Sequence, residues 1–182
     1  MRRESVCFTG QLTPEQCDMI SANLERDRDV RLNDSPASSV VKTADVSIVP
    51  WTKCQSYLKQ IENLVFETNH KVFRFDIHHY NASNSVNYNV YDSASKGEYG
   101  WHSDGKLDDF RDIKLTVVVS LSTEPYEGGD LELFVNKPQA VTDLRTPGTI
   151  MIFPSYTQHR VTPVTKGIRK TLSFWIEGPN FR

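Results

Sequence analysis

The sequence has few cysteines, no long apolar run and little net charge, and each shortage argues against a class of protein. Its 182 residues include three cysteines, which stand far apart at Cys7, Cys17 and Cys54. An odd and widely spaced set is typical neither of a disulfide scaffold nor of a cysteine-rich zinc site. We therefore expect a reducing compartment and a cytoplasmic location.

The missing apolar runs and the small charge limit the partners as well. No stretch approaches the roughly 20 apolar residues of a transmembrane helix. The start, MRRESVCFTGQ, carries two arginines without a long apolar stretch behind them, so we expect no signal peptide. The formal net charge is −2, which gives no overall attraction for nucleic acid. The sequence predicts neither a membrane nor a nucleic-acid partner.

The first 71 residues contain two predicted helices with a polar segment between them. Thr13, Pro14 and Gln16 follow the order of an N-cap, a first helical residue and a capping-box partner, which predicts a helix over residues 13–26. The segment 28–45 is polar and weakly periodic and is predicted to be a loop. A second helix is predicted over residues 51–70, because apolar residues recur on one face at Cys54, Tyr57, Leu58, Ile61, Leu64 and Val65.

From about residue 72 the sequence changes to short β-rich runs separated by turn signals. Glycine-containing turns such as EGGD at 127–130 and TPG at 146–148 interrupt the runs. Many short strands at this spacing predict a sandwich or barrel, and the apolar face of the second helix would cover one sheet. The predicted strands are VFRFDIHHY, VNYNVY, IKLTVVVSL, DLELFV, TIMIF, HRVTPV and RKTLSFWI.

A histidine and an aspartate stand two residues apart in YGWHSDGK, at His102 and Asp104. Residues i and i+2 of a strand point to the same side, so the imidazole and the carboxylate would lie together. They make up two-thirds of the 2-His-1-carboxylate set that holds non-haem Fe(II) with coordination positions left open. An isolated H-x-D also occurs as a surface ion pair. His159, in PSYTQHRVTPV, is the candidate for the third ligand from a distant strand.

Arg169 stands in the otherwise apolar run GIRKTLSFWI. A buried arginine needs a partner, and its planar fork suits a bidentate carboxylate. Strand alternation places Arg169 on one side with Thr171, Ser173 and Trp175, opposite an apolar side. That face has the composition of a ligand-binding wall. The alternative is a solvent-facing arginine beside Lys170.

Several of these elements occur together in the order of a known family. NVYDSASKGEYGWHSDG, EGGDLELF and PGTIMIFPSYTQHRVTPVTKGIRKTLSFW resemble the 2-oxoglutarate/Fe(II)-dependent oxygenases, and most closely the prolyl-4-hydroxylase-like and PKHD-type hydroxylases. The resemblance implies a mainly β fold with helices, a double-stranded β-helix (jelly roll) with N-terminal helices packed on its major sheet. We expect one oxygenase domain over residues 1–182, with helical support and a loop over 1–71 and the jelly-roll core over 72–177.

The resemblance also implies roles for individual residues. His102, Asp104 and His159 match the Fe(II) ligands, and Arg169 matches the residue that holds the distal carboxylate of 2-oxoglutarate. No catalytic residue beyond the metal centre is implied. Some prolyl hydroxylases have a cosubstrate-binding tyrosine on the strand that corresponds to IKLTVVVSL, which here offers only threonine and serine hydroxyls. The other cosubstrate-pocket positions are matched by Tyr91, Tyr99, Asn89, Val161 and Trp175.

The implied reaction is hydroxylation of an unactivated C–H bond with 2-oxoglutarate and O2, which releases succinate and CO2, with ascorbate (vitamin C) as a stimulant. The implied substrate is peptidyl or a free amino acid, prolyl above all. Two alternatives stay open: a nucleic-acid demethylase of the same superfamily, which the charge disfavours, and a cupin-like metal-binding module without oxygenase activity. We also hypothesise that residues 28–45 form a lid over the substrate, because so polar a segment buries little surface of its own.

Overall fold

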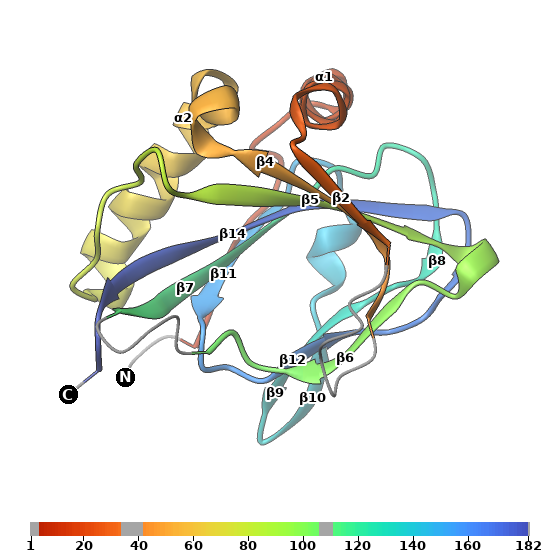
Figure 1. Ribbon diagram of the computed structural model, residues 1–182. Helices are drawn as coiled ribbons and strands as arrows, with labels where there is room; N and C mark the ends of the chain where they lie inside the picture. Colours follow the sequence, from red (N-terminus) through yellow and green to blue (C-terminus); the bar gives the residue numbers. More distant parts are fainter. Residues whose placement is uncertain (1–3, 34–41, 106–110, 182) are drawn as a thin grey trace.

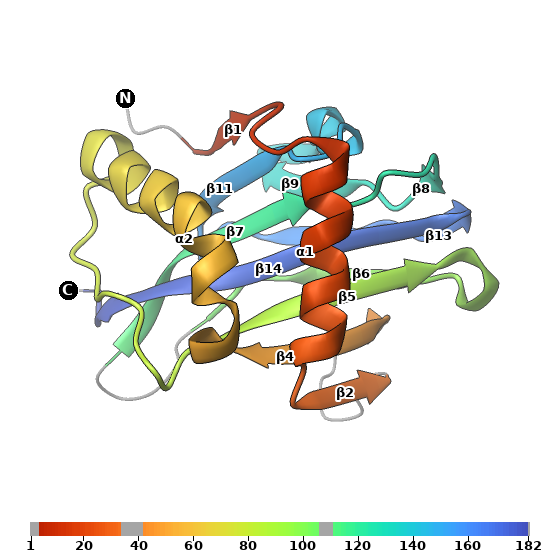
Figure 2. The same cartoon turned by 90° about the horizontal axis from the view of Figure 1, so that it is seen from above.

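The protein is described by a computed structural model over residues 4–33, 42–105 and 111–181. Two β-sheets face each other, and two helices cover the outer face of the larger sheet (Figures 1 and 2). The predicted fold class, a mainly β jelly roll with N-terminal helices on the major sheet, is confirmed. Among the described residues, no helix is both long enough and apolar enough to cross a bilayer.

The helices are α1 (Pro14–Asp27) and α2 (Trp51–Thr68), and α2 continues into a π-helical turn at Asn69–Phe73. Short 3-10 turns lie at Ser93–Ser95 and Thr142–Arg145. The strands are, in chain order, β1 (Val6–Phe8), β2 (Val30–Asn33), β3 (Lys42–Thr43), β4 (Asp45–Pro50), β5 (Ser85–Asp92), β6 (Glu98–His102), β7 (Arg111–Ser120), β8 (Glu127–Gly128), β9 (Leu131–Val135), β10 (Lys137–Ala140), β11 (Ile150–Pro154), β12 (His159–Val161), β13 (Val164–Lys166) and β14 (Ile168–Pro179).

The larger sheet has seven strands in the order β1-β11-β7-β14-β5-β4-β2, and the smaller has five in the order β10-β9-β12-β6-β3. A two-stranded ribbon pairs β13 with β8. All the strand pairs within the described residues are antiparallel. Figure 1 shows the central strands β7, β14 and β5 facing β12 and β6 of the smaller sheet. Residues from all five strands line one pocket between the sheets.

Helix α1 begins as its sequence predicts. Thr13 is the N-cap, its hydroxyl accepts from the Gln16 backbone N–H at 3.3 Å, and the Gln16 side chain accepts from the Thr13 backbone N–H at 2.8 Å. This reciprocal pair satisfies two backbone donors that a helix start leaves free. Ile20 and Leu24 are buried against the larger sheet, so the helix is held by its apolar face as well as by its cap.

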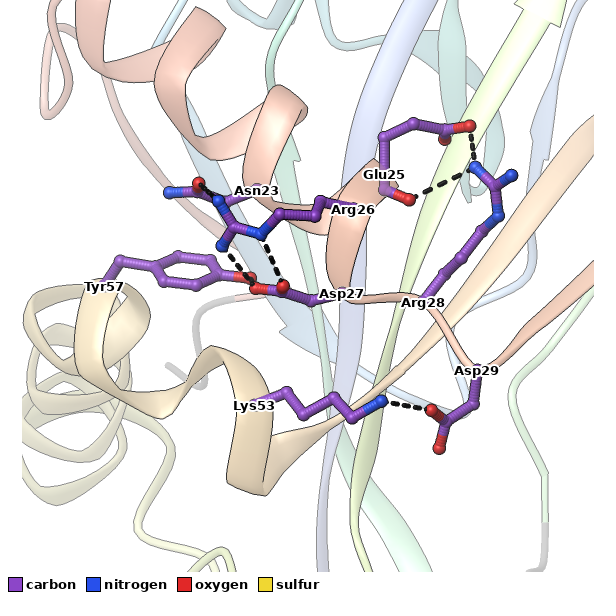
Figure 3. A network of polar contacts seen from close by, with 8 residues as sticks. All are labelled: Asn23, Glu25, Arg26, Asp27, Arg28, Asp29, Lys53 and Tyr57. Atoms are coloured by element: carbon purple, nitrogen blue, oxygen red, sulfur yellow. Dashed lines mark hydrogen bonds and ion pairs between the residues drawn. The ribbon is translucent and has the colours of Figure 1, made fainter.

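Helix α2 packs on the same sheet through the predicted apolar face, with Cys54, Leu58, Ile61 and Val65 each 2 % exposed or less. The two helices are also tied to each other at the C-terminal end of α1 (Figure 3). There the Tyr57 hydroxyl donates to Asp27 at 3.3 Å, Lys53 pairs with Asp29, and Arg26 forks onto the same Asp27 carboxylate. The ion pairs in this network are largely exposed and contribute little to stability, so the buried apolar faces are what hold the two helices on the sheet.

The predicted strand over residues 72–80 is wrong. Residues 74–80 are irregular, and Arg74 has the left-handed φ of 59°. The Asn69 side chain replaces a strand partner: its amide donates to the Phe75 carbonyl at 2.9 Å and its oxygen accepts from the Phe75 N–H at 3.0 Å. Phe75, Ile77 and Tyr80 of this irregular segment pack against the apolar core that lies between the larger sheet and the helices.

The predicted loop over residues 28–45 is partly wrong as well. Strands β2 and β3 occupy its two ends, and β2 and β4 extend the larger sheet beyond β5. The segment 1–71 therefore supplies strands to both sheets in addition to helical support. Residues 34–41 lie outside the described residues, so the lid hypothesis stays untested.

Candidate active site

The two candidate histidines face each other across neighbouring strands. His102 ends β6, His159 begins β12, and the two are register partners with ring centroids 4.1 Å apart. Their Nδ1 atoms lie 2.9 Å from the carbonyl oxygens of Gly100 and Thr157 respectively. When Nδ1–H donates to a carbonyl, Nε2 carries the free lone pair. Both Nε2 atoms are therefore prepared to bind a metal ion.

Asp104 completes the group, although not from the strand that the spacing predicts. Strand β6 ends at His102, and the Asp104 backbone N–H donates to the Ser155 carbonyl at 3.0 Å. Its two carboxylate oxygens lie 3.7 Å from His102 Nε2 and 3.6 Å from His159 Nε2. The loop after β6, anchored on Ser155, thus brings the carboxylate to the same point in space as the two imidazoles.

These three side chains have the donor set and spacing of a metal site. Their ligand atoms all lie within 4.8 Å of one another, and within the described residues no other group of three such side chains meets this test. Two imidazole nitrogens and one carboxylate suit Fe(II) and leave coordination positions open. Burial and the neighbouring His159 lower the pKa of His102, which keeps its imidazole neutral for metal binding. The residues present fit the predicted iron.

Thr116 supports the carboxylate in a way that the sequence does not reveal. Its hydroxyl, on β7, donates to Asp104 Oδ2 at 2.5 Å. Thr116 is 2 % exposed, so this is a charge-assisted bond in a shielded place. This is the strand on which some prolyl hydroxylases have a cosubstrate-binding tyrosine. Here the Thr116 hydroxyl contacts Asp104, so it orients a candidate metal ligand.

Arg169 lies inside the pocket between the sheets and is 2 % exposed. It is the register partner of Tyr91 on β5, with its guanidinium 5.1 Å from the centre of the Tyr91 ring. No carboxylate of the described residues pairs with it. Thr171, Ser173 and Trp175 line the same pocket, on the side of β14 that strand alternation predicts. The solvent-facing alternative is excluded.

The pocket residues implied by resemblance all line this cavity. The Tyr99 ring stacks on His102 with centroids 3.7 Å apart, and Asn89 donates to the Ser173 hydroxyl at 3.2 Å. Burial raises the pKa of Tyr91 to about 12, so its hydroxyl remains a donor at neutral pH. Val161 is buried beside His159 on β12. Tyr91, Tyr99, Asn89, Val161 and Trp175 are thus brought together as predicted.

The EGGD turn makes space for the arginine. Gly129 has φ +63°, and a Cβ placed there would lie 3.0 Å from the Cδ of Arg169 and 2.8 Å from a Val164 methyl. A side chain at this position would therefore displace the guanidinium stem. Gly128 is constrained by another contact, because its φ is +72° and a Cβ there would lie 2.2 Å from the Pro163 carbonyl oxygen.

Sequence reasoning missed Lys42, which also lines the pocket. It lies on the two-residue strand β3, opposite Tyr99 of β6. Its ammonium is 3.4 Å from Asn89 Oδ1 and 4.7 Å from the centre of the Tyr99 ring. Burial lowers its pKa, and the nearby Asp104 charge opposes this effect. No sequence signal marks Lys42, because it lies near the end of the polar segment 28–45, which is only weakly periodic.

A jelly roll with two imidazoles, a carboxylate and a buried arginine between its sheets defines a class, the non-haem metal oxygenases of the double-stranded β-helix fold. The model of the 2OG-Fe(II) oxygenase superfamily matches residues 86–177. The protein belongs to this superfamily, whose members use Fe(II), 2-oxoglutarate and O2.

Relatives and solved structures agree with this assignment. A PKHD-type hydroxylase of Synechococcus sp. (strain CC9605) is 37% identical over 87 residues, which is 46% of this chain and 39% of the relative. The match thus spans well under half of that relative's length. A Pseudomonas putida prolyl-4-hydroxylase has the same fold, with a TM-score of 0.74, 18% identity, and coverage of 97% of this chain and 94% of that one.

A viral collagen prolyl hydroxylase from Paramecium Bursaria Chlorella virus-1, solved with 2OG, is also similar, with a TM-score of 0.72 and 19% identity. The match covers 97% of each chain. At these identities the two structures show a shared fold and no more.

Replacing Thr116 with valine should weaken binding of a divalent metal by about 10- to 100-fold, because the carboxylate loses the donor that orients it. Calorimetric titration with Mn(II) measures the effect. Thr116→Ser keeps the hydroxyl and should retain most of the affinity. Equal metal affinity in wild type and Thr116→Val would show that the contact does not support the site.

Proposed function

We propose that the protein is a 2-oxoglutarate- and Fe(II)-dependent hydroxylase of a peptidyl or amino-acid substrate, most of all a prolyl residue. The reaction converts R–H, 2-oxoglutarate and O2 into R–OH, succinate and CO2. The observation that carries the proposal is the placement of His102, Asp104 and His159 in one pocket with Arg169, a buried cation that has no carboxylate partner among the described residues.

The metal would be held by the Nε2 atoms of His102 and His159 and by the Asp104 carboxylate. When bound, Fe(II) supplies the oxidative decarboxylation of 2-oxoglutarate and the activation of O2 for C–H hydroxylation. The chain itself orients these ligands. Carbonyl oxygens fix the two imidazole tautomers, and the Thr116 hydroxyl fixes the carboxylate.

Arg169 would bind the distal carboxylate of 2-oxoglutarate. Its guanidinium is shielded from water, and the fork geometry permits two parallel hydrogen bonds to one carboxylate. The Tyr91 hydroxyl, which stays protonated at neutral pH, is a further donor beside it. Val118, Leu131 and Val161 give the same pocket an apolar side that suits a methylene chain.

The prolyl assignment rests on similarity to PKHD-type and prolyl hydroxylases. The cupin-like alternative is not retained, because a buried Arg169 without a carboxylate partner among the described residues suits a carboxylate ligand, which a cupin-like module does not need. The demethylase alternative is not retained either, since no observation at the site favours a nucleic-acid substrate. We infer a peptide or an amino acid as the substrate partner.

Asp104→Ala should abolish succinate formation and weaken Mn(II) binding by more than about 100-fold, because it removes the anionic ligand itself. Succinate is measured with a proline-containing peptide, free L-proline and a methylated oligonucleotide as candidate substrates. Glu127→Ala, an exposed carboxylate away from the pocket, is the matched control and should behave as wild type. Undiminished turnover in Asp104→Ala would refute the metal assignment.

Arg169→Ala should weaken 2-oxoglutarate binding far more than metal binding. Losing a charge-assisted bidentate contact in a shielded pocket costs about 2–5 kcal/mol, or several tens- to thousands-fold in affinity. Titration of the Mn(II)-loaded protein with 2-oxoglutarate measures this loss.

Arg169→Lys, which keeps the charge without the fork, should fall between wild type and alanine. Arg26→Ala on the surface of α1 is the control. Unchanged 2-oxoglutarate affinity in a folded Arg169→Ala protein would assign Arg169 a structural role.

A further inference from the structure

The pocket contains a second cation that the proposed reaction does not use. Lys42 reaches in from β3, on the smaller sheet, whereas Arg169 stands on β14 of the larger sheet. Each cation lies near a different tyrosine: Arg169 near Tyr91 and Lys42 over Tyr99. The Tyr99 ring in turn stacks on a candidate metal ligand, His102. Lys42 therefore lies on the side of the pocket that holds the metal ligands.

The hydrogen-bonding capacity of this ammonium is poorly used. An ammonium has three donors, and the one oxygen partner of Lys42 in the described structure is the neutral amide oxygen of Asn89 at 3.4 Å. Asn89 is itself fixed by its own donation to the Ser173 hydroxyl. No carboxylate of the described residues forms an ion pair with Lys42. A half-buried charge in this state is stabilised by an anionic ligand.

A count of charges shows that the cosubstrate does not supply this anion. Three charged side chains line the described pocket: Asp104, Arg169 and Lys42. Fe(II) brings two positive charges, and 2-oxoglutarate brings two carboxylates. One carboxylate and Asp104 neutralise the metal, and the other carboxylate neutralises Arg169. Lys42 then remains as one positive charge beside the reaction centre, where its partial burial makes an unpaired charge costly.

We propose that Lys42 binds a carboxylate of the primary substrate, so that the enzyme acts on a carboxylate-bearing molecule in preference to an uncharged internal prolyl segment. The inference rests on the proposed function, since it takes the metal and Arg169 as the cosubstrate's partners. The carboxylate belongs either to the free α-carboxyl group of the reacting residue or to an acidic side chain beside it. Both sources offer the same chemistry to Lys42.

Matched probes that differ in one charge test the proposal. The protein is loaded with Mn(II) and saturated with 2-oxoglutarate, so that the cosubstrate's partners are already engaged. Calorimetry then compares N-acetyl-L-proline with N-acetyl-L-prolinamide, and a capped peptide carrying Asp next to Pro with its Asn counterpart. The variants are Lys42→Met, which keeps the length without the charge, and Lys42→Arg, which keeps the charge. Lys166→Met, at an exposed site, is the control.

We expect wild type to bind at least one carboxylate probe about 10- to 100-fold more tightly than its neutral partner. Lys42→Met should reduce that ratio to near one, Lys42→Arg should preserve most of it, and Lys166→Met should match wild type. Preference for the acetyl-proline pair assigns the carboxylate to the reacting residue, and preference for the Asp peptide assigns it to a neighbour.

Three results would overturn the proposal. The first is equal binding of the charged and neutral probes by wild type, and the second is no binding of either carboxylate probe. The third is a preference for the charged probe that survives in Lys42→Met, in a variant whose affinity for 2-oxoglutarate has fallen. The last would make Lys42 a cosubstrate residue. Failure of the proposed function is distinct, because the Mn(II)-loaded wild type would then not bind 2-oxoglutarate at all.

Discussion

The antiparallel pairing of β6 with β12 is the constraint on which the candidate site depends. It sets His102 directly opposite His159, and a shift of one residue in either strand would turn an imidazole out of the pocket. Asp104 joins them from the loop beyond β6, and Thr116 of the facing sheet fixes its carboxylate. The metal site therefore draws on both sheets, so their packing against each other determines its geometry.

The side chains of strand β14 alternate between the apolar core and the pocket, so one face stabilises the fold and the other is available for a ligand. Leu172 and Phe174 point into the core under α1 and α2, whereas Arg169 and Ser173 point into the pocket. The helices cover one face of the larger sheet and leave the other free to carry polar groups (Figure 2). The strand can carry buried polar side chains on its pocket face because the apolar side chains on its opposite face stabilise it in the fold.

Much of this arrangement follows from local sequence rules, and the rest depends on contacts that no local rule contains. Thr13 and Gln16 predict the start of α1, and alternation along β14 predicts the wall beside Arg169. The segment 72–80 also alternates, but it forms no strand, and the Asn69 side chain pairs with the backbone N–H and carbonyl of Phe75 within it. The contact of Lys42 with Asn89 and the bond from Thr116 to Asp104 each join side chains of different elements, so neither is marked by periodicity or motif.

The central claim is that one metal ion and one 2-oxoglutarate bind together between the sheets, held by the histidine–aspartate group at one end and by Arg169 at the other. A crystal structure of the protein with Mn(II) and 2-oxoglutarate, with the metal located by its anomalous scattering, tests this claim most directly. We predict one ion bound to His102 Nε2, His159 Nε2 and the Asp104 carboxylate, with the distal carboxylate of 2-oxoglutarate paired to Arg169. An ion bound elsewhere, or a 2-oxoglutarate molecule that leaves Arg169 without a carboxylate, would contradict it.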